Sequence, residues 1–247
     1  GHAIDFVRMH DGCSFQEAVA KLLGGEQGQT FRSASERNAE PQKLFALPLP
    51  HHNMRRVYAY LMKQRHIDRD IITHFARAGT LYEDAKYHNA VFVGTDEHGV
   101  SRHAQKRSTN SQGKSFKLNV AGSDARYSFH HLGDDGDLYV FEAPIDLLSY
   151  ITLHPENWQQ HSYVACCGTS YEPVRWILTR MEAPQMVSLC LDHDNAGDQG
   201  CERMAKQISS EFGFPTRRLV PEQKDWNEDL CALREAPRRQ RMEMEMR

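Results

Sequence analysis

The feature that most constrains the fold of this chain is a regular alternation of short apolar runs and helical patterns between residues 137 and 220. A short apolar run bounded by turn residues fits a buried strand, and each run passes to the next helical pattern through a short joint. Strands that alternate with helices in this way form a parallel sheet with crossover helices. The sequence therefore predicts an α/β domain. The expected strands are 137–142, 163–167, 186–191 and 216–220, and the expected helices are 144–153, 171–181 and 197–212.

Acidic residues follow three of these strands at the point where each strand ends. Glu142 closes the first strand and Asp146 lies one helical turn further on, while Asp192 and Asp194 follow the third strand and Asp225 follows the fourth. The carboxyl ends of parallel strands meet at one edge of a sheet, where such folds bind their ligands. Carboxylates gathered there repel one another unless a cation is present. Hard oxygen ligands in a partly open site suit Mg²⁺ or Mn²⁺.

An alternative explanation is that these acids only cap helices. Asp and Asn are favoured N-cap residues, and an acid at a helix N-terminus is stabilised by about 0.3–1 kcal/mol. A cap accounts for one acid in LDHDNAGDQG (191–200), with Asn195 or Asp194 at the start of the helix. It does not account for a second acid there, nor for Glu142 and Asp225 on neighbouring strand ends. We therefore expect a cap and a metal site at the same joint.

The charge of the chain is unevenly distributed. Residues 51–130 contain 13 Lys and Arg against 7 Asp and Glu, a balance of +6, whereas residues 131–230 contain 7 against 17, a balance of −10. A basic region beside an acidic one suggests metal-dependent chemistry on a polyanion such as nucleic acid. The basic candidates for holding phosphates are Arg102, Lys106, Arg107, Lys114 and Lys117. Gly168 and Thr169, at a strand–helix joint, are candidates for phosphate binding through backbone N–H groups, although a plain turn fits equally well.

Other features of the composition exclude some classes of protein. No run approaches the roughly 18 uncharged apolar residues of a membrane span, and there is no signal-peptide pattern. The six cysteines are scattered without Cys-x-x-Cys spacing, which is typical of buried, reduced thiols in a cytoplasmic protein. The neighbouring histidines His51 and His52, and likewise His130 and His131, are expected at the surface or in contact with phosphate.

The region before the alternation has a different pattern. Residues 54–78 have a helical period with a break and a new N-cap at Asp68. Residues 90–94 and 100–105 flank a turn-rich tetrad, which predicts a hairpin, and the polar, basic stretch 107–119 is expected to be a loop. Outside these segments we expect helices at 3–9 and 14–23, a linker at 24–50, and a helix or frayed end at 233–247.

Four stretches of the chain resemble, in order and spacing, the motifs of the Toprim domain. They are YVFEAPIDLLSYI (139–151), VACCGTS (164–170), LCLDHDNAGDQGCERMA (189–205) and KDWNEDL (224–230). The form of the acidic motifs is most similar to that of DnaG-type bacterial primases and of primase-like Toprim proteins from plasmids, phages and integrative elements. Residues 60–75 and 91–108 resemble the basic subdomain of these primases, and residues 1–24 resemble the segment that follows their zinc ribbon.

The resemblance implies a Toprim domain, preceded by a smaller α+β basic subdomain and an N-terminal helical remnant. The implied parts are a helical segment at 1–24, a linker at 25–50, the basic subdomain at 51–132, the Toprim catalytic domain at 133–232 and a basic tail or helix at 233–247. The implied activity is synthesis of short RNA or mixed primers on single-stranded DNA from NTPs, with one or two Mg²⁺ or Mn²⁺ ions. Zinc is expected only in a ribbon upstream of these residues, and a replicative helicase is a further expected partner in the bacterial cytoplasm.

The resemblance also implies roles for the acids. The implied catalytic residues are Glu142, Asp146, Asp192 and Asp194, and the implied metal ligands are Glu142, Asp192, Asp194 and Asp225. The chain departs from the family pattern at Ala143, where primases usually have Gly, and at Asn227, where they often have Asp. An Asn carbonyl can bind a metal but carries no charge, so we expect the number of ions to depend on Asn227.

Two other functions remain open at this stage. A Toprim nuclease would use the same acids to hydrolyse phosphodiesters, although the spacing of Glu142 and Asp146 favours the primase form. A catalytically weak nucleic-acid-binding module is favoured by the departures at Ala143 and Asn227.

Overall fold

The computed structural model describes residues 7–8, 10–12, 17–18, 44–110, 115–168, 170–181 and 184–245 of the chain. Contacts divide the chain into two compact units, Gly1–Gln42 and Lys43–Arg247. In the first unit, residues 7–8, 10–11 and 17–18 are helical. The rest of the helices expected at 3–9 and 14–23, and most of the expected linker, lie outside the described residues.

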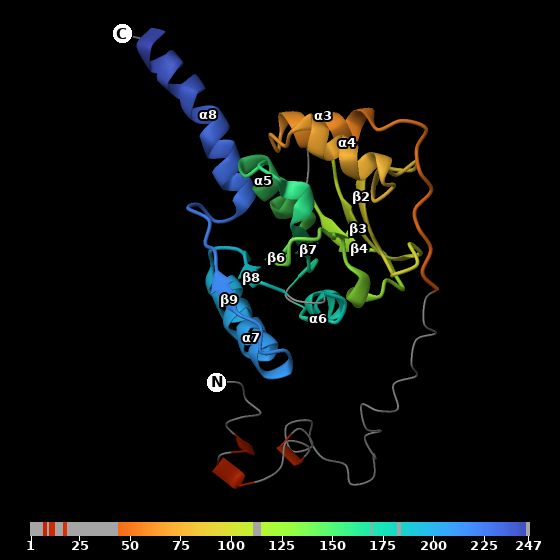
Figure 1. The fold of residues 1–247 in the computed structure, drawn as a ribbon, viewed down its shortest axis with the longest axis vertical. Helices are drawn as coiled ribbons and strands as arrows, with labels where there is room; N and C mark the ends of the chain where they lie inside the picture. The colour runs from red at the N-terminus through yellow and green to blue at the C-terminus, as the bar shows by residue number, and fades with distance from the viewer. Residues whose placement is uncertain are drawn as a thin grey trace. The chain divides into compact units, whose positions relative to one another are not determined.

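The second unit begins with two helices and a four-stranded antiparallel sheet (Figure 1). The elements are α3 (Arg55–Lys63), α4 (Arg69–Arg77), β1 (Leu81–Glu83), β2 (Ala90–Thr95), β3 (Ser101–Arg107) and β4 (Lys117–Asn119). The break expected between the helices is confirmed, because Asp68 is the extended N-cap of α4. The hairpin is also confirmed, since β2 pairs with β3. The prediction of a loop at 107–119 is wrong for its last residues, which form β4 and pair with β3.

The strand–helix alternation forms a five-stranded sheet in the order β5-β7-β6-β8-β9. Its strands are β5 (His130–His131), β6 (Asp137–Phe141), β7 (Ser162–Ala165), β8 (Met186–Leu189) and β9 (Thr216–Arg218). The pairs among β6 to β9 are parallel as predicted, and β5 adds an antiparallel edge beside β7. The helices are α5 (Pro144–Leu153), α6 (Glu172–Leu178), α7 (Asn195–Glu211) and α8 (Trp226–Glu245), with short 3₁₀ turns at Ala125–Tyr127 and Trp158–Gln160.

The central strand β6 is buried on both faces, which explains its continuous apolar sequence. Leu138 and Val140 pack into a core formed with α6 and α7. Tyr139 and Phe141 pack into a second core formed with α5 and α8, which extends to α3 and α4. The helices therefore cover both faces of the sheet, and the predicted α/β fold is confirmed (Figure 1).

The two sheets approach each other closely where β2 meets the segment before β5. Gly94 lies in β2, and a Cβ atom at this position would be 1.7 Å from the carbonyl oxygen of Tyr127. Only glycine allows the two backbones to lie this close. This contact fixes the basic first sheet beside the five-stranded sheet.

Helix α8 begins earlier than the sequence pattern indicates. The expected helix or frayed end started at residue 233, whereas α8 starts at Trp226, whose ring packs against Tyr150 of α5 with ring centroids 4.9 Å apart. None of the helices in the described residues combines the length and the apolar character needed to cross a bilayer.

Candidate functional site

The carboxyl ends of β6, β8 and β9 carry five acids, which we call the acidic edge: Glu142, Asp146, Asp192, Asp194 and Asp225. These three strands are neighbours in the sheet, in the order β6-β8-β9. Glu142 follows β6 directly, and Asp225 lies between β9 and α8. Asp192 and Asp194 follow β8. The structure therefore brings to one edge the acids that the sequence singled out.

Asp146 lies in the first turn of α5 and is only 7% exposed. Burial raises the pKa of Asp146 well above its ordinary value, and the negative charges of Asp225, Asp192 and Glu142 raise it further. A carboxyl group in this setting holds a proton more readily than a surface aspartate. The negative charges of these neighbouring carboxylates repel one another, and a bound cation would offset this repulsion.

Asp192 has the strongest signature of a metal ligand. Burial, followed by the charges of Glu142 and Asp225, raises the pKa of Asp192 to about 6, although Lys117 opposes the shift. Its Oδ1 atom is buried and has no hydrogen-bond partner. A buried carboxylate oxygen without a donor is costly in free energy unless a cation or a water molecule completes it. The donor set therefore fits a divalent ion with oxygen ligands.

A lysine from the first sheet reaches the acidic edge. Lys117 Nζ, from β4, lies 3.1 Å from Glu142 Oε1. Burial alone would lower the pKa of Lys117, but the hydrogen bond and charge of Glu142, with the charges of Asp192 and Asp146, produce a net rise. The field at this edge thus attracts positive charge.

Two of the acids also cap helices. Asp194 is the N-cap of α7, and its Oδ1 accepts a 2.8 Å hydrogen bond from the N–H of Gly197. Asp225 Oδ1 accepts from the N–H of Glu228 in the first turn of α8, also at 2.8 Å. Each cap uses one oxygen of the carboxylate. The capping explanation is therefore correct for these two residues and does not extend to Asp192.

The loop that carries Asp192 is held by a residue that the sequence did not indicate. The guanidinium of Arg218 donates to the carbonyl oxygens of Leu191 at 2.7 Å and Asp192 at 2.9 Å. On the other side, a Cβ atom at Gly197 would lie 2.1 Å from the Asp192 carbonyl oxygen, so only glycine allows α7 to start there. Arg218 appears in the sequence only as one basic residue of a strand.

The carboxylates of the acidic edge do not form a closed cluster. Among the described residues, the groups whose donor atoms all lie within 4.8 Å of one another are elsewhere: His51, Glu83 and His88, and Asp135, Asp137 and His161. An ion at the acidic edge would therefore contact some carboxylates directly and others through water. Mg²⁺, which retains several waters and uses one or two carboxylates, is suited to such a site.

Asn227 has a structural role. It is 3% exposed, and its Oδ1 accepts a 3.0 Å hydrogen bond from Arg65 Nη1. Its Nδ2 donates to the Arg65 carbonyl and to Ser149 Oγ, both at 2.9 Å. These hydrogen bonds connect the side-chain amide of Asn227 in α8 to α5 and to the segment after α3. The idea that Asn227 determines the number of ions is therefore not supported.

The basic candidates do not all lie on one face. Arg107 and Lys117 are cross-strand neighbours and so share the face of the sheet that leads to the acidic edge, and Arg107 Nε donates to Tyr60 Oη at 3.3 Å. Lys106 lies on the opposite face, because side chains alternate along a strand. Arg102 is paired with Asp96 at 2.7 Å.

One remaining phosphate candidate, Gly168, follows β7. The Gly168 N–H donates to the carbonyl oxygen of Glu142 at 3.1 Å, so this N–H is already used within the protein. Lys114 and Thr169 lie outside the described residues.

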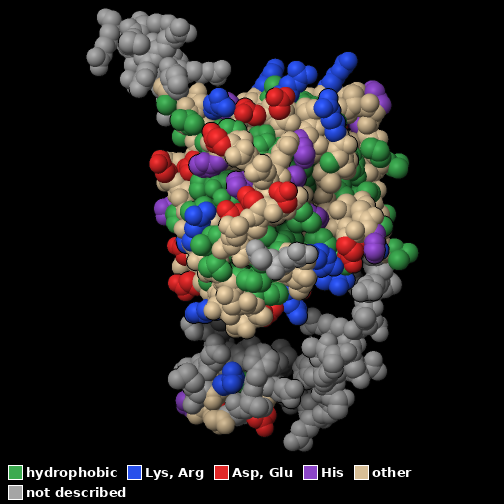
Figure 2. Space-filling view, in the orientation of Figure 1, with side chains coloured by type: hydrophobic (Ala, Val, Ile, Leu, Met, Phe, Trp, Pro, Cys, Tyr) green, Lys and Arg blue, Asp and Glu red, His purple; other side chains and the backbone are tan. Residues whose placement is uncertain are grey.

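Sequence reasoning missed a second basic surface on α3 and α4. Figure 2 shows Lys and Arg side chains at the end of the molecule where these helices lie. The exposed basic residues of the two helices are Arg55, Arg56, Lys63, Arg69 and Arg77.

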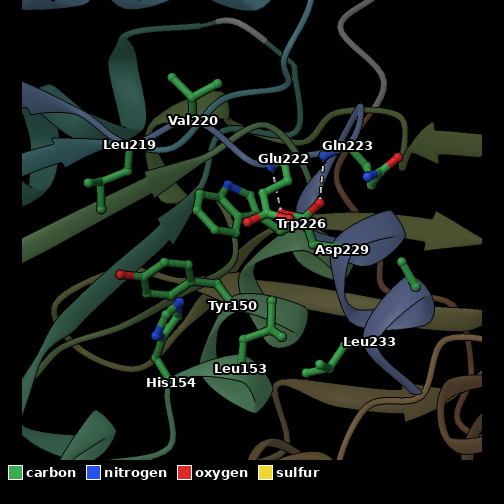
Figure 3. A pocket seen from close by; sticks show the side chains of 11 residues that line it. Tyr150, Leu153, His154, Leu219, Val220, Glu222, Gln223, Trp226, Asp229 and Leu233 are labelled. Atoms are coloured by element: carbon green, nitrogen blue, oxygen red, sulfur yellow. Dashed lines mark hydrogen bonds between the residues drawn. The ribbon is translucent and has the colours of Figure 1, made fainter. Parts of the chain in front are cut away.

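An apolar groove of about 630 Å³ lies between α5 and α8 (Figure 3). Tyr150, His154 and Trp226 contribute rings to it, and Leu153 and Leu233 contribute aliphatic side chains. None of the five acids lines this groove, so the chemistry suggested by the acidic edge lies outside it.

Comparison with known proteins identifies two regions of the chain. Residues 139–230 match the family model described as Toprim-like, and residues 59–135 match a model described as a protein of unknown function (DUF3991). Residues 139–230 therefore form a Toprim-like domain.

An uncharacterized protein of Bacillus anthracis, pXO2-78, is 28% identical over 250 residues, which cover 93% of this chain and 72% of that protein. The primase fragment of the bacteriophage T7 primase-helicase superposes with a TM-score of 0.53 at 18% identity, covering 69% of this chain and 68% of that one. The catalytic core of E. coli primase superposes with a TM-score of 0.51 at 15% identity, covering 73% and 69%. The structural likeness establishes a shared fold.

Proposed function

We propose that the chain is a metal-dependent nucleotidyltransferase that makes short primers on single-stranded DNA. The observation that carries the proposal is the acidic edge, in which the buried, unpaired Oδ1 of Asp192 lies among carboxylates of neighbouring strand ends. The fold shared with primase catalytic cores supports the same function.

In this proposal Glu142, Asp192, Asp194 and Asp225 hold one or two Mg²⁺ or Mn²⁺ ions. Such ions, when bound, favour attack of a 3′-hydroxyl on an NTP and stabilise the pyrophosphate that leaves. Asp146, which is buried beside these ligands in the first turn of α5, acts as an accessory acid.

The basic residues hold the phosphates in this proposal. Lys117, 3.1 Å from Glu142, exchanges this contact for a nucleotide phosphate when a cation neutralises the acidic edge. Arg107 extends the same face, and the basic side chains of α3 and α4 are further contacts for a template strand. A T7 structure with a TM-score of 0.51 contains the lagging-strand DNA polymerase interacting with primase domains and bound to an RNA/DNA hybrid and dTTP, which agrees with nucleic acid as a partner. A replicative helicase remains a proposed partner.

The test is primer synthesis by the purified chain on single-stranded DNA with labelled NTPs and Mg²⁺ or Mn²⁺. We expect oligonucleotides from the wild type and from the matched control Glu202→Gln, which changes an exposed acid of α7. The double variant Asp192→Asn with Asp194→Asn should make none while still binding DNA in a fluorescence anisotropy titration. Synthesis by the double variant at the wild-type rate would contradict the metal assignment. Degradation of the DNA without NTPs would instead identify a nuclease.

A further inference from the structure

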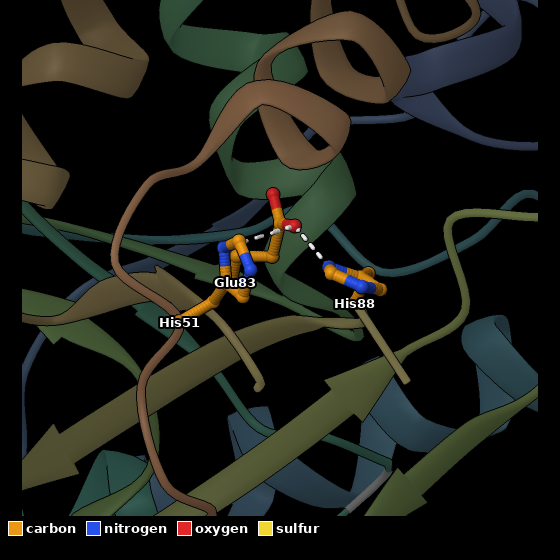
Figure 4. Close-up of side chains that lie close together, drawn as sticks. All are labelled: His51, Glu83 and His88. Carbon is orange, nitrogen blue, oxygen red and sulfur yellow. Dashed lines mark hydrogen bonds and ion pairs between the residues drawn. The ribbon is translucent and has the colours of Figure 1, made fainter. Parts of the chain in front are cut away.

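A second group of metal-ligating side chains lies on the first sheet, away from the acidic edge. His51, Glu83 and His88 point toward one another, and we call them the histidine cluster (Figure 4). Glu83 Oε1 is 2.6 Å from His88 Nδ1 and 3.8 Å from His51 Nδ1. Glu83 is 1% exposed, while the imidazoles are 19% and 27% exposed. A buried carboxylate thus faces two rings that solvent can reach.

The carboxylate of Glu83 is held in place from its other side. Glu83 Oε2 accepts hydrogen bonds from the N–H groups of Arg56 at 3.0 Å and Val57 at 3.2 Å, at the start of α3. These bonds fix the orientation of the group and leave Oε1 directed at the imidazoles. Support of this kind is what positions a ligand in protein metal sites.

His88 is also held in an uncommon conformation. Its φ is 58°, in the left-handed region that few residues other than glycine and asparagine adopt. Asp84 maintains the turn by accepting from the N–H groups of Lys86, Tyr87 and Asn89 at 2.6–3.2 Å. Thr109 Oγ1 adds a 2.8 Å hydrogen bond to the His88 carbonyl oxygen. A backbone conformation that is unfavourable and yet fixed by its surroundings is typical of functional positions.

We propose that the histidine cluster binds a transition-metal dication, with Zn²⁺ as the ion of best fit. Two imidazole nitrogens and one carboxylate oxygen are a donor set that Zn²⁺ uses, with a fourth position open to water. Tetrahedral bonds of about 2.0–2.1 Å place donor atoms about 3.3 Å apart. The donor separations of 2.6 and 3.8 Å lie on either side of this value, and all three donor atoms lie within 4.8 Å of one another. A bound ion would replace the 3.3 Å hydrogen bond that His51 Nδ1 accepts from the N–H of Asn53.

The site joins two segments that are distant in sequence. His51 precedes α3 and its N–H donates to the Glu83 carbonyl at 2.7 Å, Glu83 ends β1, and His88 lies in the turn before β2. The ion would therefore clamp the segment that enters α3 to the β1–β2 hairpin. This role stabilises the first sheet and is independent of any nucleotide chemistry.

The test is a Zn²⁺ titration of the full chain after removal of metals by a chelator, in competition with a chromophoric chelator. A large excess of Mg²⁺ in the buffer competes with Zn²⁺ for the carboxylates of the acidic edge. The variants are His88→Asn, which suits the left-handed backbone, and His51→Gln, with the exposed His98→Asn as the matched control. We expect one tightly bound Zn²⁺ per chain in the wild type and in the control, and affinity weaker by about tenfold or more in the other two.

A second readout separates loss of the site from loss of the fold. The circular dichroism spectra and metal-free melting temperatures of the variants should match the wild type within a few degrees. Zn²⁺ should raise the melting temperature of the wild type and the control but not that of His88→Asn. Equal Zn²⁺ affinity in the wild type, His88→Asn and His51→Gln would overturn the proposal. Absence of Zn²⁺ binding by the wild type would do the same, and would reduce the histidine cluster to hydrogen bonds between Glu83 and its neighbours.

Discussion

Replacing Arg218 by Met tests how the loop that carries Asp192 is held. The Met side chain occupies similar space and donates no hydrogen bond, so the carbonyl oxygens of Leu191 and Asp192 lose donors at 2.7 and 2.9 Å. The contact with Asp198 at 3.2 Å is exposed and contributes little. The carbonyl of Leu189 is less affected, because it also accepts from a backbone N–H at 3.0 Å.

The magnitude follows from these contacts. A hydrogen bond from a charged donor is worth about 1.5–3 kcal/mol, so two of them correspond to about 3–6 kcal/mol. We take the lower end of this range for two reasons. Arg218 Nε is buried without a hydrogen-bond partner, which is unfavourable, and the side chain is 22% exposed, so water weakens its hydrogen bonds. We therefore expect Arg218→Met to reduce the free energy of unfolding by about 3 kcal/mol.

The neighbouring residue Arg217 is the matched control. Its Nε donates one hydrogen bond, to Ser188 Oγ at 2.8 Å, so Arg217→Met should reduce the free energy of unfolding by about 1.5 kcal/mol. Urea denaturation of both variants, followed by far-ultraviolet circular dichroism in metal-free buffer, gives the comparison. Equal unfolding free energies for the two variants would mean that Arg218 stabilises the loop no more than Arg217 stabilises its strand, and would contradict this role of Arg218.

Three further predictions concern other parts of the site and fold. Asp192→Asn should raise the melting temperature of the metal-free protein at pH 7, because the pKa of Asp192 is raised to about 6 and its ionised form is unfavourable in the folded state. This difference in melting temperature between the variant and the wild type should shrink as the pH falls through about 6 toward 4, because Asp192 of the folded wild type then takes up a proton. Asn227→Ala should lower the unfolding free energy by about 2–3 kcal/mol and leave Mn²⁺ binding unchanged in a calorimetric titration, since three hydrogen bonds are lost and no ligand is. Gly94→Ala should lower the free energy of unfolding, measured by urea denaturation, by about 2–3 kcal/mol, because the new Cβ atom collides with the carbonyl oxygen of Tyr127.

The alternation of strands and helices along residues 137–220 could be predicted because β6 and β8 are continuous apolar runs followed by helix signals. Strand β4 could not, since all its residues are exposed and its pairing with β3 leaves no alternation in the sequence. Strand β5 has two residues, too few for any period. The beginning of α8 was missed because Trp226 and Asn227 are buried by contacts with α5, which no local pattern indicates.

The acidic edge was predictable for a topological reason, since acids at the ends of parallel strands must converge. Arg218 and the histidine cluster were not, because their partners are distant in sequence and meet only in the fold. His51 was expected at the surface or on phosphate, whereas its side chain is 19% exposed and faces Glu83. Residues that position a site from outside it carry no signal of their own in a single sequence.

A crystal soaked in Mn²⁺ shows whether the acidic edge binds a divalent metal. We expect anomalous density between Glu142, Asp192 and Asp194, with Lys117 moved from its 3.1 Å contact with Glu142. Well-ordered crystals with no anomalous density at this edge, at Mn²⁺ concentrations that support catalysis by metal-dependent nucleotidyltransferases, would contradict it.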